Sequence, residues 1–185
     1  MRKRNPGYSL IEVLTVVALT MVGSSVAVVQ LKSSRTSLEA NVAASAVIDQ
    51  LKLARESAIT ERRNVRVEFI SPSTIQVSRI ENDESTTVLS TATLPAGYTF
   101  GLPASITRDT QDGYGNATPV YFKGATSGVF LGNGSLTNHA GIVISGSVFT
   151  IGSGGDATAR AVTISGANGR TKQYYIQGSG WVERK

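Results

Sequence analysis

The sequence predicts an α+β protein in which one long amino-terminal helix precedes an antiparallel β-sheet domain. Two observations support this fold class. Residues 8–63 contain one glycine and no proline, whereas residues 64–185 contain 17 glycines and four prolines. Helix-compatible sequence is therefore followed by a region rich in turns. Short segments with alternating apolar and polar residues recur through that second region, as in half-buried strands.

The first part of the helix has the composition of a membrane span. Residues 13–29 carry no charge, and the apolar segment 10–31 is 22 residues long, or about 33 Å as a helix. The hydrocarbon core of a bilayer is about 30 Å thick. Three basic residues precede the segment, and the positive-inside rule places that end in the cytoplasm. A secretory signal peptide also begins with basic residues, but its apolar region is only about 7–15 residues long.

A single carboxylate, Glu12, lies at the start of this apolar run. A charge at the bilayer centre costs ~2.5–3.5 kcal/mol, so Glu12 is either solvated at the headgroup edge or neutralised by a cation. Cleavage after Gly7 would give Tyr8 a new α-amine four residues before Glu12, on the same helical face. With a reference pKa of about 7.7–8, that amine would be largely protonated at neutral pH and could pair with Glu12 in one helix or between copies.

The run Gly7-Tyr8-Ser9-Leu10-Ile11-Glu12-Val13, followed by an apolar helix, resembles the prepilin motif of type IV pilins and type II secretion pseudopilins. The resemblance implies a pilin-like fold, removal of a leader by a prepilin peptidase after Gly7, and N-methylation of Tyr8. It also implies an assembly role for Glu12, which in that family pairs with the amino terminus of an adjacent subunit. Tyr8 replaces the usual phenylalanine and Ser9 the usual threonine, and no proline kinks the span.

The expected domains are a leader (1–7), a transmembrane or filament-core half of the helix (8–31), an amphipathic half (32–63) and a β-rich globular domain (64–185).

In the amphipathic half, apolar residues recur every three or four positions, which predicts a stripe that packs on a sheet. The stripe is Ala40, Ala44, Val47, Leu51, Ala54 and Ala58. Asp49, Lys52 and Glu56 fall on another, solvated face, and residues 61–64 are expected to end the helix.

The β-rich domain is expected to be antiparallel. The predicted strands are 65–69, 74–80, 86–93, 120–122, 128–131, 141–144, 147–151, 161–165 and 171–177. The sequence Gly166-Ala167-Asn168-Gly169 predicts a tight hairpin between the last two strands. Residues 94–119 hold three of the five prolines and are expected to form an irregular loop.

Residues 51–67 and the closing segment 162–176 resemble the GspH/FimT group of H-type minor pseudopilins and T-type minor pilins. Some T-type members implicated in DNA uptake carry a Gly-Arg-x-Arg motif in the closing hairpin, where this chain has Gly169-Arg170-Thr171-Lys172. Cations two residues apart on a strand share one face, an arrangement suited to two phosphates. Lysine is a point charge without the forked geometry of arginine, so the replacement is not neutral.

The formal net charge of +5 is weak support for DNA binding. Loss of the leader removes three cations and leaves +2, whereas residues 155–185 alone carry +3. The candidate DNA-binding residues are Arg170, Lys172, Arg160, Arg184 and Lys185. A hairpin with solvated cations is the simpler interpretation.

Catalysis and cofactor binding have no candidate motif. The absence of cysteine excludes a thiol nucleophile and Cys-ligated zinc or iron–sulfur sites. The single histidine, His139, is expected on a surface loop, and the glycine-rich segment before Asp156 is expected to form a turn. No phosphate-binding loop, dinucleotide fingerprint or nucleophile elbow is present. We therefore expect no enzyme, no cofactor and no metal.

The expected function is that of a structural minor pilin or pseudopilin. Its amino terminus would be cytoplasmic, its single span in the inner membrane and its carboxy-terminal domain periplasmic, before assembly into a pilus or pseudopilus. The expected partners are the membrane, the prepilin peptidase and other pilins or pseudopilins. Two alternatives remain open, a DNA-binding minor pilin in DNA uptake and a major pilin.

Overall fold

A computed structural model of the chain describes residues 9–104 and 109–184, with the side chains of residues 25–34 left outside the description. The chain divides into two compact units, Met1–Thr36 and Ser37–Lys185. Helix α1 (Leu10–Glu61) runs from the first unit into the second.

The first unit consists of the amino-terminal part of α1. The backbone N–H groups of Glu12 and Val13 donate to the carbonyl of Ser9 at 3.0 and 3.2 Å, which begins the helix. The described apolar side chains of this part are exposed, with Leu10 at 80% and Leu19 at 73%. Over the described residues, no helix combines the length and apolar character that a membrane crossing requires.

In the second unit, α1 packs through the predicted apolar stripe. Ala40, Ala44, Val47, Leu51, Ala54 and Ala58 are all buried, which confirms that prediction. Asp49, Lys52 and Glu56 are exposed on another face, also as predicted. The helix ends where Arg62 adopts a φ of 52° and the N–H of Arg63 donates to the carbonyl of Ala58 at 3.3 Å. This is the hydrogen-bond pattern of a Schellman cap, with arginine in the left-handed position that usually holds glycine.

Sheet A has five antiparallel strands in the order β3-β2-β1-β6-β7. Their bounds are β1 (Val65–Ile70), β2 (Thr74–Ile80), β3 (Thr86–Thr93), β6 (Ser127–Phe130) and β7 (Leu136–Thr137). Burial alternates along β1, so Val65, Val67 and Phe69 face the core while Arg66 and Glu68 face the other way.

Sheet B has five strands in the order β11-β10-β9-β8-β4, and a sixth strand, β5, also pairs with β8. Their bounds are β4 (Tyr98–Phe100), β5 (Val120–Tyr121), β8 (Gly146–Gly152), β9 (Gly155–Ile164), β10 (Thr171–Gln177) and β11 (Gly180–Glu183). All pairings in this sheet are antiparallel.

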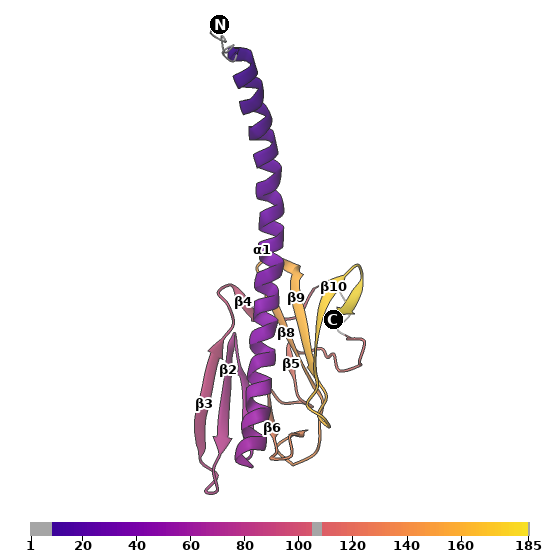
Figure 1. The fold of residues 1–185 in the computed structure, drawn as a ribbon. Helices are drawn as coiled ribbons and strands as arrows, with labels where there is room; N and C mark the ends of the chain where they lie inside the picture. Colours follow the sequence, from indigo (N-terminus) through magenta and orange to yellow (C-terminus); the bar gives the residue numbers. More distant parts are fainter. Residues whose placement is uncertain (1–8, 105–108, 185) are drawn as a thin grey trace. The chain divides into compact units, whose positions relative to one another are not determined.

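The main core joins the second part of α1 to both sheets, and Figure 1 shows this part of the helix lying across them. A smaller core contains Phe149, Tyr174 and Trp181. Strand β9 contributes to both, because Val162 belongs to the main core and Ala161 to the smaller one. Sheet B is therefore covered by apolar packing on both faces.

The predicted strand positions are largely confirmed, with five differences. Residues 141–144 form no strand and contribute only the isolated bridge between Thr137 and Val143. The expected loop 94–119 contains β4, which the sequence pattern missed because it has only three residues. Strands β7 and β11 were also missed, and β9 begins at Gly155, six residues before the predicted start. These short or glycine-rich strands form because neighbouring strands supply hydrogen bonds, not because of local alternation.

Candidate functional site

The first turn of α1 presents one carboxylate among exposed apolar side chains. Gly7 and Tyr8 lie outside the described residues, so the structure describes only the Glu12 part of the predicted site. Glu12 is exposed, and Leu10, Ile11 and Val13 around it are 80%, 67% and 51% exposed. A negative charge in the first turn interacts favourably with the helix dipole, although that effect is modest.

Three hydroxyl groups among the described side chains of this part of the helix form hydrogen bonds within it. Thr15 Oγ1 donates to the carbonyl of Glu12 at 2.8 Å, Thr20 Oγ1 to that of Val17 at 2.8 Å, and Ser24 Oγ to that of Thr20 at 2.7 Å. Because these donors are satisfied internally, the hydroxyls add little polarity to the helix surface. The described surface of this part of the helix is therefore mostly apolar apart from Glu12.

The predicted hairpin between β9 and β10 is confirmed. The N–H of Gly169 donates to the carbonyl of Ser165 at 2.8 Å, and the N–H of Arg170 donates to Asn168 Oδ1 at 3.0 Å. Gly169 has a φ of 65°, a conformation that a side chain would disfavour. The hairpin holds Arg170 just before β10, where its side chain is exposed.

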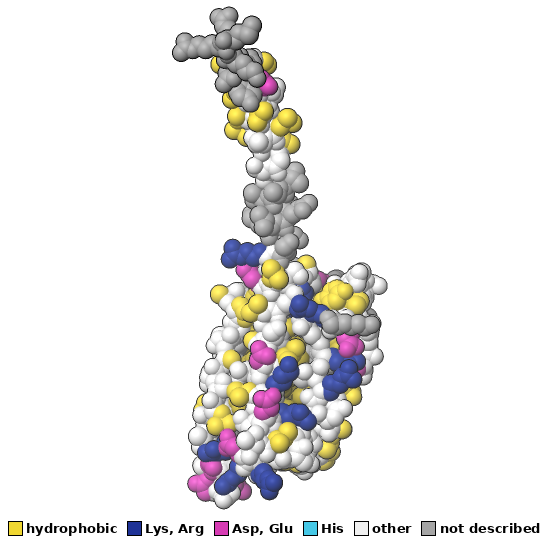
Figure 2. Space-filling view, viewed as in Figure 1, with side chains coloured by type: hydrophobic (Ala, Val, Ile, Leu, Met, Phe, Trp, Pro, Cys, Tyr) yellow, Lys and Arg dark blue, Asp and Glu magenta, His cyan; other side chains and the backbone are white. Residues whose placement is uncertain are grey.

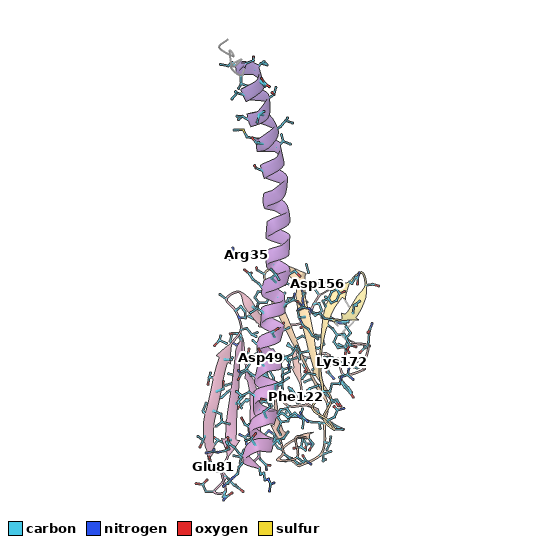
Figure 3. All side chains as sticks on the ribbon, in the orientation of Figure 1. Arg35, Asp49, Glu81, Phe122, Asp156 and Lys172 are labelled. Atoms are coloured by element: carbon cyan, nitrogen blue, oxygen red, sulfur yellow. The ribbon has the colours of Figure 1, made fainter. Side chains whose placement is uncertain are left out.

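Lys172, in β10, is held by a cross-strand ion pair. Its Nζ donates to Glu183 Oε2 of β11 at 2.9 Å, and both side chains are about 30% exposed. The hydrogen bond to Glu183 raises the pKa of Lys172. Figure 3 labels Lys172 on this outer part of sheet B. A phosphate that approached Lys172 would have to compete with the Glu183 carboxylate.

Arg160 lies inside the protein, with 4% of its surface exposed. Its Nε donates to Asn41 Oδ1 at 2.9 Å, its Nη2 to Ser37 Oγ at 3.2 Å, and its Nη1 to the carbonyls of Ala157 and Ala159 at 3.2 and 2.8 Å. Burial lowers the pKa of Arg160. The hydrogen bonds of the guanidinium therefore link β9 to α1. Arg160 is not exposed on the hairpin surface, so it is not available there to bind a phosphate.

Of the remaining predicted cations, Arg184 lies near enough to Arg160 for its charge to add to the effect of burial in lowering the pKa of that guanidinium. Arg184 is exposed and its N–H donates to the carbonyl of Gln173 at 2.8 Å, whereas Lys185 lies outside the described residues. Figure 2 shows basic and acidic side chains interspersed over the viewed face of the second unit.

Arg55, a cation of α1 that was not among the predicted site residues, lies against the hairpin. Its Nε donates to the carbonyl of Gly134 at 3.1 Å, and a Cβ added at Gly169 would lie 2.3 Å from that nitrogen. The glycine therefore leaves room for an arginine from α1. Nothing in the local sequence pattern indicates this contact, because the two residues lie far apart along the chain.

His139 is exposed on a loop, as predicted, with its Nε2 3.0 Å from Ser127 Oγ. Asp156 Oδ1 accepts the N–H of Ala104 at 2.9 Å. Within the residues that the structure describes, no group of three or more His, Asp or Glu side chains is placed to hold a metal ion.

No protein-family model matches the chain, and no curated protein matches it in sequence. Among solved structures, the minor pseudopilin EpsH from the type 2 secretion system of Vibrio cholerae is similar, with 14% identity and a TM-score of 0.49 over 73% of this chain and 95% of that chain. The type IV minor pilin FimU of Pseudomonas aeruginosa is similar with 17% identity and a TM-score of 0.47 over 76% and 94%. At these low identities, the similarity concerns the fold alone and assigns no function to this chain.

Proposed function

We propose that the chain is a structural subunit of a type IV pilus or a type II secretion pseudopilus, processed after Gly7 and assembled through its amino-terminal helix. One observation carries the proposal: an exposed apolar helix begins at Leu10, within the prepilin-like sequence, and bears a single carboxylate, Glu12, in its first turn. Neither the sequence motifs nor the described side-chain clusters favour catalysis.

The apolar helix is the element that the membrane and the filament would both use. In the proposed sequence of events, residues 8–31 first rest in the inner membrane, with the carboxy-terminal domain in the periplasm. Assembly then exchanges lipid contacts for contacts with neighbouring helices. Association within lipid depends on close packing and polar pairing, because lipid tails are as apolar as the helix surface.

Glu12 would set the axial position of each subunit. In the proposed pairing, its carboxylate faces the amino terminus of Tyr8 in a neighbouring copy. An unpaired carboxylate in apolar surroundings is unfavourable, so a register that neutralises Glu12 is favoured over registers that leave it unpaired. N-methylation of Tyr8 would keep the positive charge, so the pairing survives that modification.

The processing step can be tested directly. Mass spectrometry of the chain from cells with an active prepilin peptidase should show an amino terminus at Tyr8 carrying a methyl group. Gly7→Ala should reduce cleavage, whereas Gly23→Ala should not, since an added Cβ at Gly23 meets no atom within 4 Å. An intact Met1 under these conditions would remove the basis of the proposal.

We favour a minor subunit, because residues 51–67 and 162–176 resemble the GspH/FimT group. Counting copies of the chain in purified filaments distinguishes a minor from a major pilin. DNA binding remains the second candidate, and the exposed Arg170 is the residue that favours it.

A further inference from the structure

The outer face of sheet A contains a pocket of about 400 Å³ that the proposed filament function does not use. Its floor is formed by β1 and β6 on the side directed away from the core. The strand register pairs Arg66 of β1 with Val129 of β6, and Val129 in turn with Thr137 of β7. These three residues lie in one row across the sheet, and Arg66 is half-buried in it.

One wall of the pocket is the loop of residues 138–143, part of which the sequence pattern predicts as a strand. Asn138 Oδ1 accepts the N–H groups of Ala140 and Ile142 at 3.0 and 2.9 Å, and the bridge between Thr137 and Val143 fastens the loop to β7. His139 is fixed by its contact with Ser127, which lies on β6. The loop is therefore anchored at both ends beside the pocket.

The opposite wall is the end of β2 and the turn that follows it. Ile80 and Leu131 line the pocket with apolar surface, and Glu84 lies at its edge, exposed and with a φ of 65°. The lining thus combines an apolar part, formed by Ile80, Val129 and Leu131, with a polar part that includes Arg66 and His139.

Arg66 is the unusual group in this pocket. Its Nε is buried and has no hydrogen-bond partner among the described residues. None of the ion pairs found in the described part of the chain includes Arg66. A desolvated donor without an acceptor is unfavourable, and such groups in folded proteins call for a specific explanation. The Arg66 side chain as a whole is half-buried and lines the pocket, so a small rotation of its guanidinium would bring this donor within reach of an acceptor in the pocket.

We propose that the pocket binds a carboxylate attached to a short apolar group. The planar guanidinium of Arg66 offers parallel donors that match the two oxygens of a carboxylate. The aliphatic part of the ligand would contact Ile80, Val129 and Leu131, and His139 provides a second polar group beside the carboxylate. Inorganic phosphate offers the negative charge without the apolar part and would bind less well. This site is independent of the proposed filament function, since it uses neither Glu12 nor the helix before Ser37.

The test uses the full chain in detergent micelles with N-acetylleucine as the probe and N-acetylleucinamide as its uncharged match. Calorimetry or NMR titration should give a dissociation constant on the order of 1–10 mM for the acid, a range typical of a fragment of this size. The amide and inorganic phosphate should bind at least about tenfold more weakly than the acid. The amide lacks the negative charge, and phosphate lacks the apolar group. Equal binding of the acid and the amide, or no binding of the acid, overturns the proposal.

Variants assign the binding to Arg66. Arg66→Gln should abolish measurable binding and leave the fluorescence of Trp181 unchanged, while Lys52→Gln, at an exposed cation on α1, should bind as wild type does. Glu84→Gln should tighten binding about twofold, because it removes a negative charge at the edge of the pocket that repels the carboxylate of the ligand.

If Arg66→Gln does not fold, Arg66→Lys serves instead and should weaken binding several-fold, because an ammonium lacks the parallel donors. Unchanged binding in the folded Arg66 variant overturns the assignment.

The source of the carboxylate is decided by a second pair of probes. A tripeptide that ends in leucine is compared with hexanoate, a free small carboxylate. Tighter binding of the peptide by about tenfold identifies a polypeptide carboxyl group as the natural ligand, and equal binding identifies a small organic acid. If neither probe binds, the proposal is overturned.

Discussion

Arg160 Nε of strand β9 donates a hydrogen bond of 2.9 Å to Asn41 Oδ1 of helix α1, near the start of the second unit. The same oxygen also accepts from Gln173 Nε2 of β10 at 3.4 Å. Asn41 is therefore a polar junction between the helix and two strands of sheet B. A buried guanidinium needs such acceptors, because removing it from water is costly unless its donors are paired.

Asn41→Ala should destabilise the second unit. The substitution leaves Arg160 buried with one acceptor fewer, which we expect to cost about 1–3 kcal/mol of unfolding free energy. In a domain of this size, each kcal/mol corresponds to a fall of about 2–4 °C in Tm. The fluorescence of Trp181, which is buried in β11 and is the single tryptophan of the chain, reports the transition. Lys52→Ala, at an exposed helix position, is the control, and equal Tm values for the two variants would refute the role of Asn41.

Two leucines of α1 should respond differently to the same substitution. Leu51 is 1% exposed and Leu53 is 37% exposed. Leu51→Ala removes buried apolar contacts and leaves a cavity, so it should lower the unfolding free energy by about 2–5 kcal/mol. Leu53→Ala should lower it by less than about 1 kcal/mol, because its side chain already contacts solvent. Denaturant titration measures both values, and a larger loss at Leu53 would contradict the packing of the helix.

Acid should destabilise the second unit through Asp112. Burial alone would raise the pKa of this carboxyl, but hydrogen bonds from the hydroxyls of Thr110 and Thr163 at 2.7 and 2.6 Å and from the N–H of Tyr114 lower it overall. A carboxyl whose pKa is lower in the folded state stabilises the fold above its unfolded pKa of about 3.9 and loses that contribution as the pH falls through the folded value.

The pH dependence can be assigned with one substitution. Between about pH 5 and pH 2, wild-type Tm should fall more steeply than that of Asp112→Asn, which has no carboxylate to protonate at this site. Asp49→Asn, at an exposed helix position, should keep the wild-type slope. Parallel curves for wild type and Asp112→Asn would show that the acid sensitivity arises elsewhere.

Glu12→Ala should separate membrane insertion from assembly. Removal of the carboxylate makes the helix more apolar, so insertion should be preserved, whereas the proposed pairing with a neighbouring amine is lost. We expect incorporation into filaments to fall by at least about tenfold, equivalent to roughly 1.4 kcal/mol per subunit contact. Immunoblots of sheared filaments and of membranes measure the two steps, with Glu56→Ala as a matched acidic control. Normal incorporation of Glu12→Ala would disprove the pairing.

Any DNA binding by the hairpin should depend more on Arg170 than on Lys172. Arg170→Ala should reduce the slope of log K against log salt by about one, the effect of one lost phosphate contact. Lys172→Ala should reduce it less, because Lys172 is already paired with Glu183. Fluorescence anisotropy with duplex DNA measures both slopes. If the Arg170→Ala, Lys172→Ala double variant binds as wild type does, the hairpin is not the DNA site.

Local pattern was enough to predict the elements that have many residues and a regular period. The stripe through Ala40, Val47 and Leu51 and the strands at 74–80, 86–93 and 171–177 were predicted with their final burial or bounds. Strands β4 and β7 have three and two residues, so they carry no periodicity of their own and depend on β8 and β6 for their hydrogen bonds.

The amino-acid sequence by itself determined the extent of the helix and which of its faces packs on the sheets. It also determined the position of the Glu12 carboxylate relative to the apolar run. These follow from spacing along one element. Only the tertiary structure decided the environment of each charge. Arg160 is buried against Asn41, Lys172 is paired with Glu183, and Arg66 has a buried Nε without a partner. The physical reason is that solvation and pairing depend on groups far away in sequence, which are brought together only when the sheets and the helix pack.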